Sequence, residues 1–140
     1  MRITRAADYG VRLMTRLAAT PLGTRMTVAE LAKDCQSSMA FTGKILQRLV
    51  AARLVISHRG FEGGFELARP AGSITLLDII TALDGTLCIN DCLPDGVGCD
   101  RAATCTAHGV WARAQEALAA VLGGASLDRL AADRNEVSHG

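Results

Sequence analysis

Aromatic residues are scarce in this sequence, and long apolar runs are absent from it. Aromatic residues make up 4% of the 140 residues, whereas Ala and Leu abound. This composition favours one compact, mainly helical domain. The sequence opens with Met1-Arg2-Ile3-Thr4-Arg5, without the apolar core of a signal peptide, and no segment reaches transmembrane length. We therefore expect a cytoplasmic protein with no membrane partner, whose thiols stay reduced rather than form a disulfide framework.

The sequence also lacks a catalytic constellation. It has no Ser/His/Asp set, no phosphate-binding loop and no paired carboxylates suited to acid–base chemistry, and its histidines, His58, His108 and His139, are scattered. Gly63-Gly64 resembles a phosphate-binding loop only superficially, because the strand-to-helix context is missing. We expect a protein that is not an enzyme.

Acidic residues are few in the first part of the chain. Residues 1–60 hold ten Lys or Arg and three Asp or Glu, a net charge of +7. Residues 61–140 hold five Lys or Arg and eleven Asp or Glu, a net charge of −6. A basic half suggests contact with a polyanion such as DNA. The alternative is that the two halves neutralise each other within the fold, and charge alone does not separate the two interpretations.

The first half of the chain predicts three helices. Apolar residues at helical spacing predict one helix over residues 4–19. A capping box, Thr27 with Glu30, opens a short helix that ends near Asp34. After a tight turn the next helix runs over about 38–52. Two short helices joined in this way are the signature of a helix-turn-helix.

A β-hairpin follows the helix pair directly. The β-rich runs 54–59 and 65–69 flank a Gly-rich turn, which completes a winged helix-turn-helix over residues 1–70. Arg59 lies at the tip of this wing, where a guanidinium can enter a narrow minor groove. Gly43 within the preceding helix costs about 1 kcal/mol relative to Ala, which close approach to the floor of a DNA groove would offset. The alternatives are a tight helix–helix contact at Gly43 and a solvated arginine at the tip.

The second half of the chain predicts a connecting helix within 71–87 and a long helix over about 106–122. The long helix has an apolar stripe, formed by Trp111, Ala114, Leu118, Val121 and Leu122. Little chain is left to cover this stripe, so we expect 106–133 to form a dimerisation helix with a short terminal helix, followed by a flexible tail, 134–140. A homodimer agrees with the helix-turn-helix, because such proteins usually bind two half-sites. The alternative is that the long helix packs back on the first helix.

A cluster of cysteines lies between the connecting helix and the long helix. Four of the five cysteines fall within 18 residues, at Cys88, Cys92, Cys99 and Cys105. Pro and Gly residues make segment 88–108 a loop that can gather several thiols around one point. The gaps of three, six and five residues differ from the paired knuckles of structural zinc and suit an iron–sulfur cluster. A thiol/disulfide switch and zinc remain alternatives, and buried small hydrophobes fit so polar a loop poorly.

Residues throughout the chain resemble the Rrf2 family of bacterial transcription regulators. The similarity covers about residues 1–132 and is carried by Met1-Arg2-Ile3-Thr4, Lys44-Ile45-Leu46-Gln47-Arg48-Leu49, Arg59-Gly60 with Gly63-Gly64, and the last three cysteines of the loop. The resemblance implies a homodimer that binds an operator in double-stranded DNA and acts as a repressor. It also implies control by an iron–sulfur cluster that senses iron, redox state or nitric oxide.

By that resemblance the cluster is ligated by Cys92, Cys99 and Cys105. One coordination position is then left to fill. Asp8 matches an aspartate that the nitric-oxide-sensing type supplies from the partner's first helix to a 4Fe–4S cluster, and we favour it as the lone acid of a basic helix. His108 matches the histidine of the cluster-biogenesis type, which holds a 2Fe–2S cluster. Cys88 is a less favoured ligand, and Cys35 is expected to be a small packing residue.

The expected DNA contacts lie on the second helix of the pair and at the wing tip: Ser38, Ala40, Phe41, Gly43, Lys44, Gln47, Arg48, Arg59 and Gly60. The chain departs from the family in three respects. Its first gap among the ligand cysteines is six residues instead of five, Cys88 is an extra thiol, and Ala40 and Gly43 lack the polar side chains of the biogenesis regulator. That regulator's operator preference is therefore not transferred. The alternative function is a zinc-stabilised or thiol-redox winged-helix protein without an iron–sulfur cluster.

Overall fold

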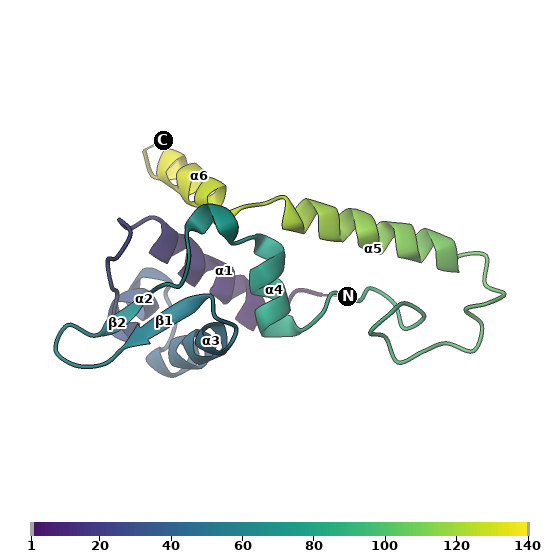
Figure 1. Ribbon diagram of the computed structural model, residues 1–140, viewed down its shortest axis with the longest axis horizontal. Coiled ribbons are helices and arrows are strands. Elements are labelled where there is room, and N and C mark those ends of the chain that lie inside the picture. The colour runs from purple at the N-terminus through teal and green to yellow at the C-terminus, as the bar shows by residue number, and fades with distance from the viewer. Residues whose placement is uncertain (1, 140) are drawn as a thin grey trace.

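The computed structural model describes residues 2–139. Within that range it contains six α-helices, one short 3-10 helix and one two-stranded antiparallel sheet. The elements in chain order are α1 (Arg5–Ala18), α2 (Val28–Asp34), α3 (Met39–Ala51), β1 (Val55–His58), β2 (Gly64–Leu67), the 3-10 helix η1 (Ala71–Ser73), α4 (Leu76–Asp84), α5 (His108–Gly123) and α6 (Leu127–His139). The helix pair α2–α3 and the hairpin confirm the predicted winged helix-turn-helix. Figure 1 shows α5 extending away from the body formed by α1–α4 and the sheet, with a long loop joining α4 to α5.

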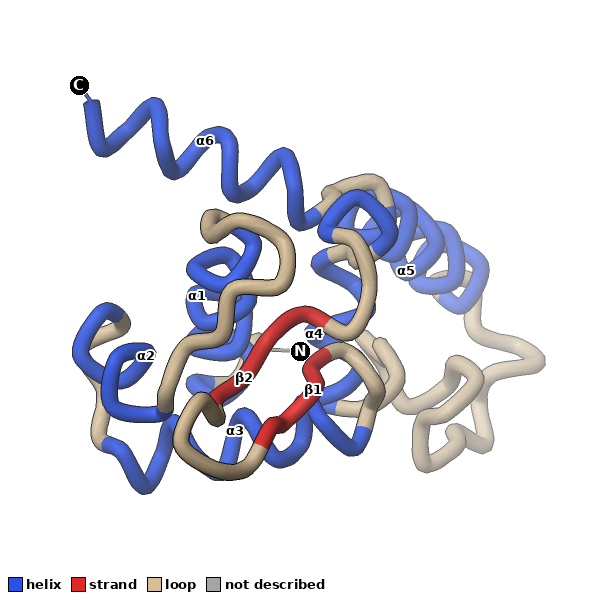
Figure 2. The backbone as a smooth tube through the Cα atoms, turned by 60° about the vertical axis from the view of Figure 1, so that its left-hand side comes forward, coloured by secondary structure: helices blue, strands red, loops and turns tan. Residues whose placement is uncertain are grey.

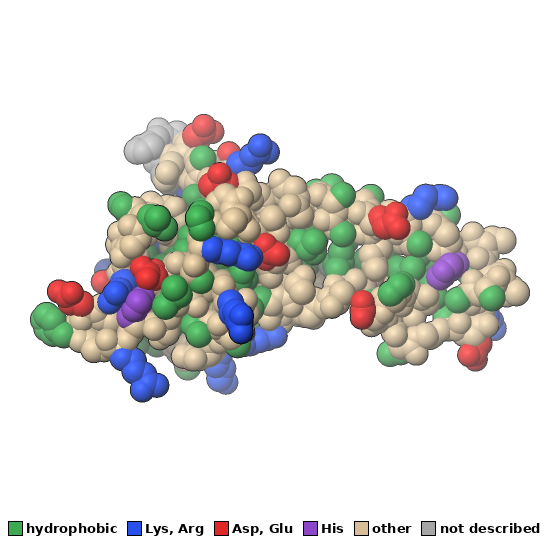
Figure 3. All heavy atoms as spheres, in the orientation of Figure 1, with side chains coloured by type: hydrophobic (Ala, Val, Ile, Leu, Met, Phe, Trp, Pro, Cys, Tyr) green, Lys and Arg blue, Asp and Glu red, His purple; other side chains and the backbone are tan. Residues whose placement is uncertain are grey.

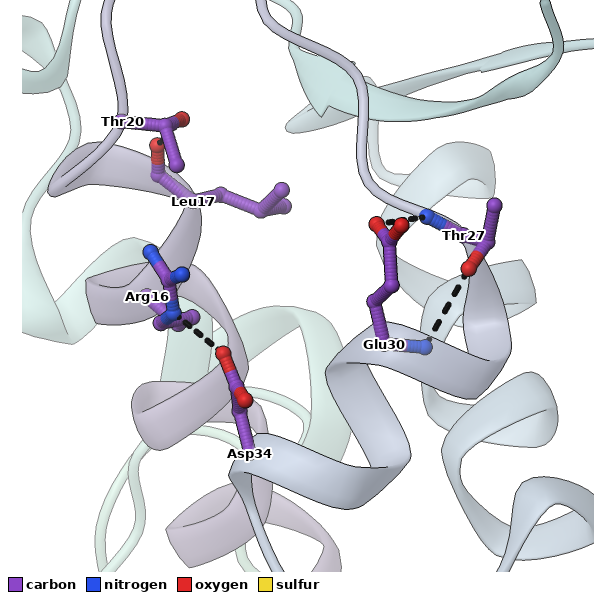
Figure 4. Close-up of polar contacts among 6 residues, drawn as sticks. All are labelled: Arg16, Leu17, Thr20, Thr27, Glu30 and Asp34. Carbon is purple, nitrogen blue, oxygen red and sulfur yellow. Dashed lines mark hydrogen bonds and ion pairs between the residues drawn. The ribbon is translucent and has the colours of Figure 1, made fainter.

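Side-chain caps and one ion pair fix the start of the helix-turn-helix. The predicted capping box of α2 is present: the Glu30 amide donates to Thr27 Oγ1 at 3.2 Å, and the Thr27 amide donates to Glu30 Oε2 at 3.1 Å (Figure 4). The end of α2 is joined to α1 by the Arg16–Asp34 pair, whose Nε and Oδ2 atoms lie 2.5 Å apart (Figure 4). The capping box therefore fixes the start of α2, and the ion pair attaches its end to α1.

The core is centred on α1, which packs against α4, α6 and α3. Ala7, Leu13 and Met14 of α1 are buried there. Gly10 allows α1 and α4 to lie in close contact, because a Cβ at this position would lie 2.1 Å from Leu83 Cδ1. Cys35 is buried at the edge of the core, as the sequence predicted. Burial of its thiol raises the pKa of Cys35.

Helix α6 differs from the sequence expectation. The sequence predicted one or two helical turns up to about residue 133 and a flexible tail over 134–140, whereas the helix continues to His139. Its start is fixed by the core: Leu127 is fully buried, and its amide donates to Ile74 O at 2.8 Å. Once the first turn is fixed, each further residue adds a helical hydrogen bond. Residue 140, the last of the predicted tail, lies outside the described residues.

No helix within residues 2–139 is both long and apolar enough to cross a membrane.

Candidate DNA-binding surface and cysteine loop

The outer face of α3 is formed by small and polar residues. Ala40, Lys44 and Gln47 are exposed, and Gly43 lies among them, half-buried. A Cβ at Gly43 would meet no atom within 4 Å, so this glycine does not serve a tight helix–helix contact. The open surface at Gly43 agrees with the expectation that another molecule approaches it. Ser38 is also exposed, but its Oγ accepts the Phe41 amide at 3.1 Å and caps the helix.

The same face of α3 carries a residue that the sequence analysis missed. Met39, the first residue of the helix, is 59% exposed. It lies outside the apolar stripe that faces the core, which includes Ile45 and Leu49. An apolar residue that breaks the helical period is a signal available in the sequence. An exposed Met at this position can contact the methyl group of thymine in a major groove.

Two of the α3 residues predicted to contact DNA, Phe41 and Arg48, also contact neighbouring helices. The ring of Phe41 is half-buried and packs edge-on against Tyr9, with ring centroids 5.5 Å apart. The Arg48 guanidinium donates to Leu83 O at the end of α4, where a cation complements the negative end of the helix dipole. Both residues therefore join α3 to its neighbours, and the exposed face of α3 away from these contacts includes Ala40, Lys44 and Gln47.

A basic cluster at the start of α1 lies beside α3. The Arg5 guanidinium lies over the rings of Tyr9 and Phe41, at 5.3 and 5.9 Å from their centroids. The Arg12 guanidinium also lies over the Tyr9 ring, 5.0 Å from its centroid. Cation–π contacts of this kind order an arginine side chain. Part of the positive charge of the first half of the chain, that of Arg5 and Arg12, thus lies beside α3.

The wing places Arg59 and Gly60 in an exposed turn beside α3. Strands β1 and β2 pair from Val55 with Leu67 to His58 with Gly64, and their loop projects from the body (Figure 2). In Figure 3, Lys and Arg side chains project along the lower edge of the body, below the wing and α3. The wing tip and the free face of α3 therefore border one basic edge of the molecule.

The cysteine loop is a series of turns rather than an extended linker. The Gly98 amide donates to Asp91 O at 2.8 Å, and the Cys105 amide donates to Arg101 O at the same distance. A hydrogen bond attaches the loop to α5, since Gln115 accepts the Ile89 amide at 2.9 Å. Leu93 of the loop is buried. The four thiols are spread along these turns, half-buried at Cys88 and Cys92, and exposed at Cys99 and Cys105.

The donor atoms of the loop fit a metal group by their chemistry, although the turns hold them apart. All four thiols are free, and among the side chains that the structure describes no three of His, Cys, Asp or Glu are close enough together to hold a metal ion. Closing the loop around one centre therefore requires its turns to rearrange. Helix α5 begins three residues after Cys105 and has no side-chain cap, although the His108 amide donates to Cys105 O at 3.3 Å. The positive end of the helix dipole favours an anionic group there.

The two candidate fourth ligands differ in their surroundings. Asp8 is half-exposed on α1 and pairs with Arg12, with Oδ2 and Nη2 3.1 Å apart. His108 begins α5, three residues after Cys105, and its Nδ1 is buried without a hydrogen-bond partner among the described residues. A buried polar atom without a partner is unfavourable unless another group completes its coordination. The His108 Nδ1 atom is thus unpaired among the described residues, whereas the Asp8 carboxylate is paired with Arg12.

Helix α5 buries none of its residues within one chain. An apolar groove of about 460 Å³ lies between α1, α4 and α5, lined by Ile3, Asp8, Val11, Leu76, Ile80, Leu118 and Leu122. Two residues of the predicted stripe, Leu118 and Leu122, face this groove. Trp111 and Val121 of the same stripe are exposed. The stripe is therefore open to a further partner rather than buried in the body.

A winged helix-turn-helix with a basic edge beside its second helix and wing defines the class of DNA-binding transcription regulators. The model of the Rrf2 family, described as an iron-dependent transcriptional regulator, matches residues 3–133. The chain therefore belongs to the Rrf2 family. Members of the family are transcription regulators and not enzymes, which agrees with the absence of a catalytic constellation in the sequence.

Relatives and solved structures support the same assignment. The HTH-type transcriptional regulator Rv1287 of Mycobacterium tuberculosis is 42% identical over 87 residues, 62% of this chain and 54% of its own length. The chain thus spans about half the length of this relative. The global cysteine regulator CymR of Bacillus subtilis is 27% identical with a TM-score of 0.78, covering 94% of this chain and 97% of CymR. IscR of T. potens is 25% identical with a TM-score of 0.74, covering 98% of this chain and 90% of IscR.

Proposed function

We propose that this protein is a repressor that binds an operator in duplex DNA as a homodimer, and that an iron–sulfur cluster on the cysteine loop controls its DNA affinity. The observation that carries the proposal is the position of the loop. Four free thiols lie on one segment that joins the DNA-binding body to α5. A change in the shape of this loop changes how α5 is held relative to the winged helix.

Each DNA contact has a distinct role in this proposal. Lys44 and Gln47 reach base edges and phosphates in the major groove, while Ala40 and Gly43 let the backbone of α3 approach closely. Arg59 enters the adjacent minor groove from the wing. The support for this assignment is the exposure of Ala40, Lys44, Gln47 and Arg59. Lys and Arg side chains also project along the lower edge of the body, below the wing and α3 (Figure 3).

The homodimer is formed through α5 in this proposal. Its support is the apolar stripe that one chain leaves open and the groove beside it, lined by Leu118 and Leu122. In a symmetric dimer, two recognition helices read two half-sites of an operator. The dimer therefore binds the operator more tightly than one subunit binds one half-site. The spacing of the two winged helices then depends on α5 and on the loop that leads to it.

The cluster ligands proposed are Cys92, Cys99 and Cys105. The fourth is Asp8, from the partner's α1, with a 4Fe–4S cluster, or His108 with a 2Fe–2S cluster. When bound, the cluster supplies iron sites that respond to iron supply, oxidants or nitric oxide. The Gln115–Ile89 hydrogen bond ties the start of this loop to α5.

A second candidate function is control by thiol oxidation or by zinc, without an iron–sulfur cluster. Two observations favour it: the four thiols are free and accessible, and the fold is similar to that of CymR, described as a global cysteine regulator. Purification without air separates the two candidates. A coloured protein with iron and acid-labile sulfide supports the cluster, whereas a colourless protein, with or without zinc, supports the second candidate.

A further inference from the structure

The tip of the wing carries an aromatic side chain that is not among the DNA contacts proposed above. Phe61 follows Arg59 and Gly60 in the loop between β1 and β2, and it is fully exposed, with a relative accessible surface of 105%. Phenylalanine is among the residues most often buried in proteins. A fully exposed ring here gives the folded monomer no packing, so its use must be sought outside the monomer.

The turn that presents Phe61 is tight. The Gly63 amide donates to Gly60 O at 3.0 Å, so Phe61 and Glu62 occupy the two central positions of a β-turn. A Cβ at Gly63 would lie 2.6 Å from His58 O, which explains the glycine at this close approach. The geometry of the turn explains the glycine at position 63, but it does not explain an aromatic residue at position 61.

Neighbouring contacts brace the turn against the body. The Arg25 Nη1 group donates to Glu62 O at 3.1 Å. Met26 and Phe65 exchange two backbone hydrogen bonds, of 3.0 and 2.8 Å, which attach β2 to the segment before α2. A braced loop holds the backbone of residue 61 in one place, so less conformational freedom of the loop is lost on binding.

We propose that Phe61 is an apolar wedge that enters the minor groove of duplex DNA beside the Arg59 guanidinium and opens a base step there. This inference rests on the proposed DNA-binding function and adds a determinant of sequence preference to it. Minor-groove proteins combine arginine with apolar wedges that partly unstack a step and bend the duplex. Pyrimidine–purine steps such as TA and CA/TG unstack most easily. The wing is therefore expected to prefer such a step, without any hydrogen bond to its bases.

The charge around Phe61 favours DNA over a protein partner. The ring is two residues from Arg59, on the hairpin that borders the basic edge of the molecule. Glu62 is the acidic residue of the turn, and it lines a polar hollow with Arg25 and Glu30 on the side of α2. Neither Arg59 nor Phe61 lines that hollow. The carboxylate thus lies beside a different surface, and it provides a charge control at the same turn.

The experiment uses duplexes selected from a random pool by the wild-type protein. Affinity for the selected duplex is measured over a series of KCl concentrations for wild type, Phe61→Ala, Phe61→Leu and Glu62→Gln. We expect Phe61→Ala to weaken binding about 10-fold, equivalent to about 1.4 kcal/mol, with an unchanged salt slope because no charge is removed. Phe61→Leu should recover part of the affinity, and Glu62→Gln should bind more tightly than wild type.

Two further readouts identify the wedge. A selection repeated with Phe61→Ala should lose the preference for a flexible step at the wing position. A 2-aminopurine base at that step should gain fluorescence on binding wild type and not on binding Phe61→Ala. Phe61→Ala affinity within twofold of wild type, with the same selected step, would overturn the wedge while leaving the DNA-binding function intact. If the wild-type protein selects no duplex at all, the proposed function fails and the wedge fails with it.

Discussion

Thr4 and Asp84 join the start of α1 to the end of α4 through two hydrogen bonds. The Thr4 amide donates to Asp84 Oδ2 at 3.1 Å, and the Thr4 hydroxyl donates to Oδ1. The same hydroxyl oxygen accepts the Ala7 amide and so caps α1. Because the chain leaves α4 at Gly85 towards the cysteine loop, this contact holds the first turn of α1, with Asp8, at the origin of the loop.

Thr4→Ala should therefore lower the free energy of unfolding by about 1–2 kcal/mol, because it removes a helix cap and a contact between helices. Asp84→Ala keeps the cap and removes both hydrogen bonds between the helices, including the one from the Thr4 amide that Thr4→Ala retains. Because these bonds are exposed, its cost should stay below about 1 kcal/mol. Urea denaturation of both variants measures the difference. Thr4→Ser, which keeps the hydroxyl, is the matched control and should resemble wild type. Equal losses for the two alanine variants would show that the cap contributes nothing.

The cluster content should depend on three cysteines and not on the other two. Cys92→Ala, Cys99→Ala and Cys105→Ala should each abolish the colour and the acid-labile sulfide of protein purified without air. Cys35→Ala is the control, because this thiol is buried in the core and should leave the cluster in place. Full iron and sulfide in all three ligand variants would show that the ligand assignment is wrong. We expect Cys88→Ala to keep most of the cluster, and a colourless product would place Cys88 among the ligands.

The fourth ligand should be revealed by a pair of substitutions. We expect Asp8→Ala to alter the spectrum and the lability of the cluster, and His108→Ala to leave both nearly unchanged. Arg12→Ala adds a control on the Asp8 side, because it removes the ion pair and frees the carboxylate without removing it. The reverse pattern, with a 2Fe–2S spectrum, would assign the position to His108, whose Nδ1 has no partner among the described residues.

Substitutions of three basic residues should distinguish side chains that contact DNA from one that stabilises the fold. Arg59→Ala should cost about 1–3 kcal/mol at a selected duplex and lower the salt slope by about one, and Lys44→Ala should also weaken binding. Arg48→Ala is the matched control, because its guanidinium donates to Leu83 O. It should lower stability and leave DNA affinity close to wild type. Unchanged DNA affinity in Arg59→Ala and Lys44→Ala would show that α3 and the wing do not form the DNA-binding surface.

The dimer should be sensitive to charge on the stripe of α5. Leu118→Glu places a carboxylate in the apolar groove beside Ile80 and Leu122, where an unpaired charge is poorly solvated. We expect this variant to sediment as a folded monomer and to lose affinity for an operator with two half-sites. Glu116→Gln, on an exposed position of the same helix, is the control and should remain dimeric. A dimeric Leu118→Glu protein would move the interface away from this groove.

Several features of the molecule could be predicted from the sequence because they depend on neighbouring residues. The capping box at Thr27 and Glu30, the hairpin around its Gly-rich turn and the loop character of 88–108 all follow from local hydrogen bonding and backbone preferences. Cys35 was correctly predicted as a packing residue.

Other features depend on which elements meet in space, and no local pattern reports that. Arg48 and Phe41 have the chemistry of DNA contacts, but α4 supplies a carbonyl to the first and Tyr9 packs against the second. The sequence alone left two explanations for Gly43, and only the absence of neighbouring atoms excluded a tight helix–helix contact within the chain.

By itself, the sequence determined the winged helix, the basic half and the grouping of the thiols, because caps, turns and periodicity act over a few residues. Tertiary structure decided the rest. It extended α6 to His139 by burying Leu127 at its start. It left the face of α5 uncovered within one chain, and it gave the His108 Nδ1 no partner among residues 2–139. Each of these outcomes depends on contacts between segments far apart in the chain, and long-range packing sets those contacts.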